Sequence, residues 1–238
     1  MTASRINPSL LSEIEQRLQT VRPAIPDDVT LIAISKKQPA EAIRAAYELG
    51  LRHFGESRVQ EAIPKQEALA DLDDITWHFI GHLQGNKASK ALQHFAWIHS
   101  VHSLKLAQRL DQLLAKNGGS GLDSPSPNLL LQVKMMPDPN KSGWSVSELW
   151  QDLEVLSQLS HLKIVGLMTI PPFGQSDDDI GAVFEQAHAL AERIRDQAFP
   201  TIQMNQLSMG MSGDYPLAIQ AGATMVRVGR TIFGDRPV

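Results

Sequence analysis

The chain has 238 residues, of which 42% are hydrophobic and 20% are charged, and its formal net charge is −4. This mildly acidic balance gives no basic face for nucleic acid, no run of about 18 apolar residues could span a membrane, and the absence of cysteine excludes disulfides, thiol catalysis and thiolate zinc sites. The N-terminus lacks the apolar core of a signal sequence, so we expect a cytoplasmic α/β protein.

The first predicted element is an extra helix near the N-terminus. Asn7-Pro8 can cap and open it. One apolar stripe at helical spacing is then formed by Leu10, Leu11, Ile14, Leu18 and Val21.

After Pro26 strand-like and helix-like segments alternate. The expected strands are Val29–Ser35, His53–Gly55, Trp77–Gly81, Trp97–Val101, Leu129–Val133, Ile164–Ile170, Gln206–Met209 and Thr224–Val228. Runs that are apolar throughout suit parallel strands covered on both faces. Eight of them in this length favour a single (β/α)8 TIM-like barrel. An open doubly wound sheet remains the alternative, because periodicity cannot show closure.

One segment breaks this alternation. NGGSGLDSPSPN, residues 117–128, is rich in Gly, Ser and Pro and is typical of a flexible loop. It falls between a predicted helix and a predicted strand, so it would lie opposite the carboxyl ends of the strands. We therefore expect residues 1–238 to form one domain that carries this loop as an insertion.

Lys36 stands at the end of the first predicted strand, in LIAISKKQP. Ligands bind at the carboxyl ends of parallel strands, and Lys36 shares the alternation of Ile32 and Ile34. A lysine amine has a pKa of about 10.4, and burial lowers it, which exposes a neutral amine able to attack a carbonyl. The ordinary alternative is a lysine that points to solvent, and Lys37 competes for the same role.

Two glycine turns follow the seventh and eighth predicted strands. LSMGMSGDYP contains Gly210 and Ser212 before a helix that begins near Tyr215, and VRVGRTIFG contains Gly229 and Arg230. Such turns let backbone N–H groups approach an anion, and phosphate sites in barrels often use these two loops. The alternative is that the polar side chains of the first turn, Ser212 and Asp214, are ordinary helix N-caps.

Arg227 interrupts the short apolar strand MVRV. If it faces inward it needs a partner, which would be either a carboxylate of the core or an acceptor atom of a bound ligand.

The eight histidines raise a metal hypothesis, above all the pairs His78 with His82 and His99 with His102. We expect no metal site. Spacing of this kind unites ligands on a helix, whereas these pairs lie where strands run into loops, without an acidic ligand at matching spacing.

Several motifs taken together resemble the pyridoxal phosphate homeostasis protein family. They are AISKKQP, FGES, RVQE, WHFIGHLQGNK, KSGW, GLMTI, LSMGMSGDY and MVRVGRTIFG, from about Leu31 to Gly234. That family is similar to the barrel domain of alanine racemase, which has fold type III, without that enzyme's second domain. The chain departs from the family pattern at Ser57, where asparagine is frequent, at Arg230, where a small hydroxyl residue is common, and at His102, where an acid is expected.

The resemblance implies that pyridoxal 5′-phosphate (PLP) is held as a Schiff base on Lys36, with Arg227 facing the pyridine nitrogen. An arginine does not readily give up its proton, so the ring nitrogen would stay unprotonated and the cofactor would be a weakened electron sink.

The resemblance also assigns the phosphate. Ser212, Gly229 and Arg230 would hold it, Arg230 chiefly through its backbone N–H, and Gly210 would shape the turn.

The preferred function is a non-catalytic PLP carrier or regulator in vitamin B6 and amino-acid homeostasis. We expect a monomer, with PLP-dependent enzymes or regulatory proteins as candidate partners. A racemase needs two opposed bases. Here the second domain is absent, and the two tyrosines, Tyr47 on an outer helix and Tyr215 at a helix start, are poorly placed.

Three alternatives remain. The protein could be a PLP-dependent amino-acid racemase, or a Schiff-base aldolase that acts on a phosphorylated sugar without cofactor. It could also be a partner-binding module that uses the 117–128 loop or the N-terminal helix.

Overall fold

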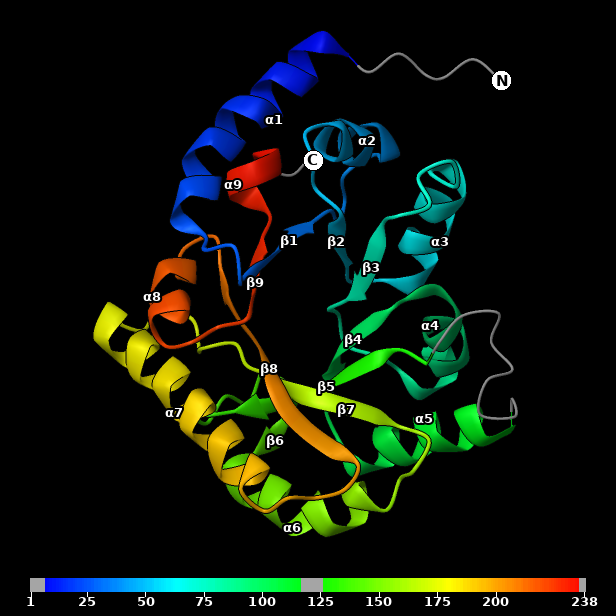
Figure 1. Cartoon of the computed structure of the whole chain (residues 1–238), viewed down its shortest axis with the longest axis vertical. Helices are drawn as coiled ribbons and strands as arrows, with labels where there is room; N and C mark the ends of the chain where they lie inside the picture. Colours follow the sequence, from blue (N-terminus) through cyan, green and yellow to red (C-terminus); the bar gives the residue numbers. More distant parts are fainter. Residues whose placement is uncertain (1–6, 117–125, 236–238) are drawn as a thin grey trace.

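Eight parallel strands close into a barrel in the computed structural model, which describes residues 7–116 and 126–235. The order around the barrel is β1-β2-β3-β4-β5-β7-β8-β9. Closure comes from β1 pairing with β9, where Thr30 faces Met225 and Ala33 faces Val228, and from β4 pairing with β5. Helices surround the strands (Figure 1). The fold is therefore a (β/α)8 TIM barrel, as the sequence predicts, and not an open sheet.

Each predicted strand corresponds to a strand of the barrel. The strands are β1 (Thr30–Ile34), β2 (His53–Glu56), β3 (Thr76–Phe79), β4 (Trp97–Val101), β5 (Asn128–Lys134), β7 (Lys163–Met168), β8 (Ile202–Met211) and β9 (Met225–Val228). The largest difference is β8, which begins at Ile202 and not at Gln206. Its first half alternates buried Ile202 and Met204 with exposed Gln203 and Asn205, so it does not form an apolar run.

A ninth, two-residue strand was not predicted. β6 (Trp144–Ser145) pairs with the end of β5 outside the barrel, where Val133 faces Trp144 and Lys134 faces Ser145. Ser145 then caps the next helix, and its side chain accepts from the Glu148 N–H.

The helices form the outer layer of the molecule. They are α1 (Pro8–Val21), α2 (Ala40–Glu48), α3 (Val59–Ala68), α4 (Ala88–His94), α5 (Leu104–Lys116), α6 (Val146–Ser157), α7 (Asp177–Arg195), α8 (Tyr215–Gln220) and α9 (Arg230–Phe233), with short 3-10 helices at Arg22–Ala24 and Gly85–Lys87.

The N-terminal helix α1 packs on the outside of the barrel. The Asn7 side chain caps it by accepting from the Ser9 N–H at 3.0 Å, as predicted. Its buried stripe, Ile14, Leu18 and Val21, faces the barrel side, and α1 lies beside α9 and α2 (Figure 1). Each fully buried aliphatic side chain of this kind contributes about 1.5–3 kcal/mol.

The interior of the barrel has a mixed composition. A small apolar cluster fills part of it, made of Ile32, Ile34, Leu130, Val165, Met168 and Met225. Polar side chains are buried as well, among them His78, His99, Ser208 and Arg227. Because an unpaired buried polar group is costly, these residues must bond to one another or to the backbone.

The predicted loop 117–128 is only partly described. Residues 117–125 lie outside the described residues, and Asn128 already belongs to β5, where it faces Trp97 of β4 and Lys163 of β7. The loop therefore ends before Asn128.

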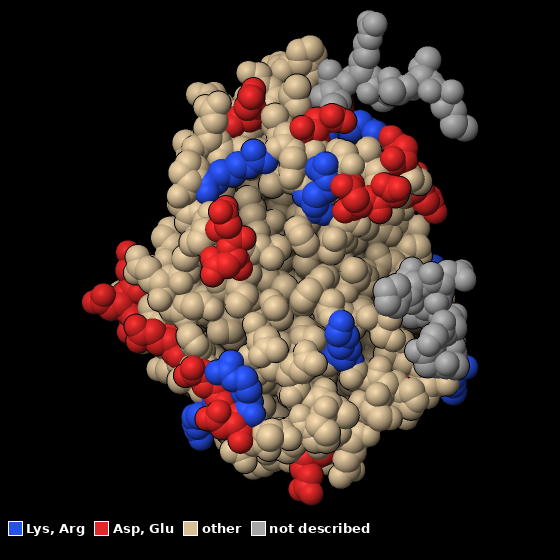
Figure 2. Space-filling model, in the orientation of Figure 1, with Lys and Arg blue, Asp and Glu red and all other residues tan. Residues whose placement is uncertain are grey.

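The surface shows no large basic face in the view of Figure 2, where acidic and basic side chains lie in small groups mainly toward the periphery. Within the described ranges, none of the helices is both long enough and apolar enough to cross a membrane.

Candidate functional site at the carboxyl end of the barrel

Lys36 is half-buried and stands two residues after Ile34, the last residue of β1. The Ser35 N–H donates to the Gly55 carbonyl oxygen at 3.0 Å, which extends the strand ladder to the residue before Lys36. The Gln38 N–H then donates to the Ser35 carbonyl oxygen at 2.9 Å and closes a turn. Lys37 occupies the left-handed region, with φ of 65°. The lysine is thus placed at the carboxyl end of the barrel by a strand on one side and a tight turn on the other.

An ionic cluster, composed of the buried Glu56 and Lys65 and the half-buried Glu61, contacts this turn. The Lys65 ammonium donates to the Ser35 carbonyl oxygen at 2.9 Å, to Glu56 Oε1 at 2.7 Å and to Glu61 Oε1 at 2.8 Å. Ser35 Oγ donates to Glu56 Oε1 at 2.7 Å. The residue before Lys36 is therefore bonded through both its backbone and its side chain.

The residue after Lys36 is held by the same cluster. The Lys37 N–H donates to Glu61 Oε1, the atom that also accepts from Lys65. The backbone is thus fixed on both sides of Lys36.

Glu56 is fully buried at the end of β2. Burial raises the pKa of its carboxyl, and the hydrogen bond and charge of Lys65 oppose this rise. Within the described residues, Glu56 Oε2 is buried without a hydrogen-bond partner. The carboxylate therefore depends on Lys65 and Ser35 for its stabilisation.

Arg227 points into the barrel from β9 and is 4% exposed. Its Nη1 donates to Ser208 Oγ at 2.7 Å and its Nη2 donates to the Thr169 carbonyl oxygen at 3.0 Å. Among the described residues, no carboxylate forms an ion pair with it, so its observed partners are neutral. Burial lowers the pKa of Arg227 to about 10, against the opposing charge of Asp214, and the guanidinium remains protonated at neutral pH.

Three histidines continue from the partner of Arg227 across the barrel. His99 Nδ1 lies 2.8 Å from Ser208 Oγ, His99 Nε2 lies 2.9 Å from His78 Nδ1, and His78 Nε2 lies 3.0 Å from His53 Nδ1. His78 and His99 are fully buried and His53 is half-buried. Burial lowers the pKa of His78 and of His99 well below the ordinary value of 6.5, aided by neighbouring charges.

The two glycine turns meet beside the end of β1. The Gly229 N–H donates to Ser212 Oγ at 3.2 Å, which joins the turn after β9 to the turn after β8. A Cβ at position 229 would lie 3.2 Å from the Cβ and 3.3 Å from the carbonyl oxygen of Ile34, so glycine allows this close approach. Gly229, which is bonded to Ser212, therefore lies against Ile34, the residue two positions before Lys36.

Gly210 was expected in the turn after β8 but lies within the last two residues of that strand, where the backbone conformation requires glycine. Its φ is 86°, and a Cβ there would lie 2.6 Å from the Cβ of Ala218 and 2.9 Å from the Cα of Tyr215. Glycine thus lets α8 pack directly on the end of β8.

The N-cap alternative for the turn after β8 is wrong. Asp214 precedes α8, but in the described range 126–235 its side chain makes no cap hydrogen bond and accepts from the Met211 N–H at 2.5 Å. Ser212 likewise bonds to Gly229. Because α8 and α9 are one to two turns long, any anion here would depend on local N–H groups more than on a helix dipole.

The remaining predicted site residue, Arg230, opens α9 with an exposed side chain directly after Gly229. β9 and β1 are neighbours, with Arg227 opposite Ile32, so all six predicted residues belong to the carboxyl half of adjacent strands β1, β8 and β9 or to the turns that follow.

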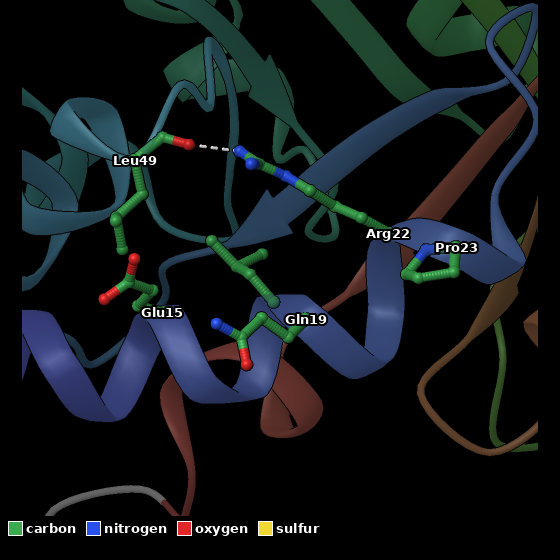
Figure 3. Close-up of a pocket in the computed structure, with 6 residues that line it drawn as sticks. Glu15, Gln19, Arg22, Pro23 and Leu49 are labelled. Carbon is green, nitrogen blue, oxygen red and sulfur yellow. Dashed lines mark hydrogen bonds between the residues drawn. The ribbon is translucent and has the colours of Figure 1, made fainter.

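A pocket of about 310 Å³ lies elsewhere, between α1 and the end of α2 (Figure 3). It is lined by Glu15, Leu18, Gln19, Arg22, Pro23 and Leu49, and the Arg22 guanidinium donates to the Leu49 carbonyl oxygen. Since α2 begins after the Lys36 turn and ends before β2 starts, this pocket lies toward the amino ends of the strands and contains none of the predicted site residues.

The comparisons with known proteins agree with this geometry. Residues 10–237 match the family model described as alanine racemase, N-terminal domain. The chain is 48% identical to the pyridoxal phosphate homeostasis protein of Synechocystis sp. over 230 residues, which cover 97% of this chain and 99% of that protein. The chain belongs to the pyridoxal phosphate homeostasis protein family.

Solved structures of relatives show the same barrel. PipY of Synechococcus elongatus, in its structure with PLP bound, is 50% identical with a TM-score of 0.85, over 93% of this chain and 100% of that one. Alanine racemase of Clostridium difficile 630 has a TM-score of 0.71 at 14% identity, over 96% of this chain and 58% of that one. The second likeness concerns the fold alone.

The sequence did not predict the residues that bond to Arg227 or those that hold the backbone beside Lys36. FGES and WHFIGH were recognised as motifs, but Glu56, His78 and His99 received no structural role. A signal for the histidines exists, because His78 and His99 stand inside short strands among apolar neighbours, where a polar side chain needs a buried partner. Lys65 gives no comparable signal, since it is one of several charged residues on a helix.

The other members of the two histidine pairs, His82 and His102, lie next to each other. Their ring centroids are 4.4 Å apart with the ring planes tilted by 32°, and His82 Nδ1 lies 2.9 Å from Ser142 Oγ. In the described part of the chain, no group of three His, Asp or Glu side chains is arranged to hold a metal ion.

Proposed function

We propose that this protein binds PLP reversibly through the Lys36 amine and acts as a non-catalytic carrier or regulator in vitamin B6 and amino-acid homeostasis. The observation that carries the proposal is the meeting of the Ser212 and Gly229 turns beside the end of β1, next to the turn that fixes Lys36. When bound, PLP supplies an aldehyde for a lysine amine and an electron-accepting ring. PipY, a relative with 50% identity, has been solved with PLP bound.

The residues after β8 and β9 fit a phosphate group. The Gly229 N–H donates to the Ser212 hydroxyl, so the two groups are adjacent, and we propose that a phosphate oxygen replaces this contact and accepts from both. We also propose that the Arg230 backbone N–H joins them while its exposed side chain stays in solvent. Gly210 serves this arrangement indirectly, because it allows α8 to sit against β8.

Arg227 fits a position facing the pyridine nitrogen. It is a protonated donor, and among the described residues no carboxylate contacts it directly, although the charge of Asp214 acts on it from a greater distance. An arginine donates a hydrogen bond to the ring nitrogen but does not readily transfer its proton. This disfavours the carbanion chemistry of PLP enzymes and supports a carrier over a racemase.

The tyrosines support the same conclusion. The Tyr47 hydroxyl donates to Asp74 Oδ1 at 2.5 Å on the outer surface, and Tyr215 is the first residue of α8. We propose that the whole chain acts as one PLP-binding domain, as a monomer in the cytoplasm, with PLP-dependent enzymes or regulatory proteins as its partners.

The first test is the visible absorption spectrum after PLP is added, followed by borohydride reduction and peptide mass mapping. We expect a yellow band that reduction fixes onto Lys36. Lys36→Ala should lack the band, and the matched variant Lys37→Ala should keep it. A protein that stays colourless, or one modified at Lys37, would contradict the proposal.

A second measurement separates a carrier from an enzyme. Amino-acid racemisation is followed in the PLP-loaded protein, together with activation of an apo PLP enzyme mixed with it. A carrier activates the apoenzyme and racemises nothing; turnover of an amino acid that disappears in Lys36→Ala would establish a racemase.

A further inference from the structure

A continuous line of polar side chains crosses the interior of the barrel. It runs from Arg227 through Ser208, His99 and His78 to His53, with successive atom pairs 2.7, 2.8, 2.9 and 3.0 Å apart. The side chains come from β9, β8, β4, β3 and β2. We call this set the histidine chain.

The first contact sets a direction. A guanidinium can only donate, so Ser208 Oγ accepts from Arg227 Nη1. The Ser208 hydroxyl retains one hydrogen to donate, and His99 Nδ1 lies 2.8 Å away.

The two histidine–histidine contacts extend this constraint. A short contact between two ring nitrogens needs one protonated and one unprotonated atom. A neutral imidazole carries one N–H, so the choice at His99 fixes the choice at His78 and then at His53. Full burial of His78 and His99 keeps these rings neutral. The histidine chain therefore has two possible states: either all of its N–H bonds point away from Arg227, or all of them point toward it.

The charge of Arg227 distinguishes these states. When every N–H points away, each group presents its negative end to the buried guanidinium, and Ser208 uses its hydrogen on His99 Nδ1. When every N–H points toward Arg227, the dipoles oppose the cation, and Ser208 must accept twice while its own hydrogen finds no acceptor within the chain. A buried cation without a carboxylate depends on such dipoles, since in a low-dielectric interior they act strongly.

We infer that Arg227 orients the histidine chain in one direction, with His99, His78 and His53 all protonated at Nε2, and that the chain in turn positions Arg227. Ser208 and the histidines are then positioning residues for Arg227, and their effect on the cofactor rests on the proposed function, in which Arg227 faces the cofactor ring. His53, the half-buried member, ends the chain.

The orientation is tested by 15N NMR of the histidine rings in the protein without PLP. We expect unprotonated Nδ1 and protonated Nε2 in all three histidines. In Arg227→Met, His99 and His78 should show a substantial population with Nδ1 protonated. A protonated Nδ1 in wild-type His78 or His99, or tautomers unchanged in Arg227→Met, would overturn the inference.

The positioning role is tested by PLP titration of Ser208→Ala. We expect PLP to bind roughly 10- to 100-fold more weakly, as for the loss of one hydrogen bond to a charged group. The matched control is Ser100→Ala. Ser100 is also buried, but its hydroxyl donates to the Gly81 carbonyl oxygen and is not part of the histidine chain, so this variant should bind PLP as wild type does.

The outcomes separate the two proposals. Equal PLP binding by Ser208→Ala and wild type would overturn the positioning role. A wild-type protein that binds no PLP would overturn the proposed function, whereas the NMR result would still decide the orientation of the chain.

Discussion

Two buried cations lie in contrasting surroundings in this barrel. Lys65, on α3, has carboxylate oxygens of Glu56 and Glu61 within 2.8 Å. Arg227, inside the barrel, bonds to a hydroxyl and to a backbone carbonyl, and its pKa falls to about 10 through burial. The first charge is neutralised where it lies, and the second is solvated by neutral dipoles.

The difference matches what each cation can do. A lysine paired with two carboxylates has little electrostatic effect beyond them, so Lys65 serves to hold the backbone at Ser35. An arginine that is bonded only to neutral groups can still act on a ligand through its charge and its remaining N–H donors. We take this to be why the proposed ligand contact involves Arg227.

The largest effect is expected when the paired cation is removed. Lys65→Met leaves Glu56 buried without its counter-charge, so the free energy of unfolding should fall by about 3–5 kcal/mol. Urea denaturation measures this loss. The variant should also loosen the Lys36 turn, because the Ser35 carbonyl loses its ammonium donor.

The control is an ion pair near the surface. Arg44 makes two hydrogen bonds of 2.6 and 2.7 Å to Asp71, whose side chain is 61% exposed. Arg44→Met should cost at most about 1 kcal/mol. Equal losses in the two variants would show that burial of Glu56 is not what makes Lys65 necessary.

A smaller effect is expected for Arg227→Met. This change leaves Ser208 and Thr169 without a donor but strands no opposite charge, so the loss of stability should be about 1–3 kcal/mol. The same urea titration measures it. A loss as large as that of Lys65→Met would mean that Arg227 compensates a carboxylate, and Asp214 would be the one to examine.

The last expected effect is a dependence of stability on pH. Burial lowers the pKa of His78 and His99 below 6.5, so above that pH both are neutral in the folded and the unfolded chain. As the pH falls below 6.5, the two histidines bind protons in the unfolded chain but not in the folded one. The free energy of unfolding therefore falls until the pH reaches the lowered pKa values of the folded protein. Each ring contributes up to about 1.4 kcal/mol per pH unit.

Denaturation between pH 7 and 5 measures this slope in wild type and in His78→Gln. We expect a shallower slope in the variant, because one buried ring with a lowered pKa is removed. A slope unaffected by His78→Gln would remove the pH argument for a neutral histidine chain.

Most of the fold was accessible from the sequence. Apolar runs identified the barrel strands because parallel strands covered on both faces carry few polar residues. β8 was truncated for the opposite reason, since Gln203 and Asn205 are exposed, and β6 is too short to leave any pattern.

The site was accessible to a different degree. Lys36 and the glycine turns could be found because each has a local signature at a strand end. The partners of Arg227 could not, because Ser208 and Thr169 are 19 and 58 residues away in the sequence and meet it only when the barrel closes. The contacts of Lys65 are hidden for the same reason, as it reaches Ser35 across 30 residues.

The turn at Lys36 also has a kinetic consequence. The Ser35, Lys37 and Gln38 amides all donate to fixed acceptors, so their hydrogens should exchange with deuterium as slowly as those of the adjoining sheet, although they lie in a connecting segment. The backbone that carries Lys36 would then be among the least mobile of the connecting segments. The time for which a molecule stays bound to Lys36 would accordingly depend on the bond to the amine and on the loops after the other strands, and not on movement of the Lys36 turn.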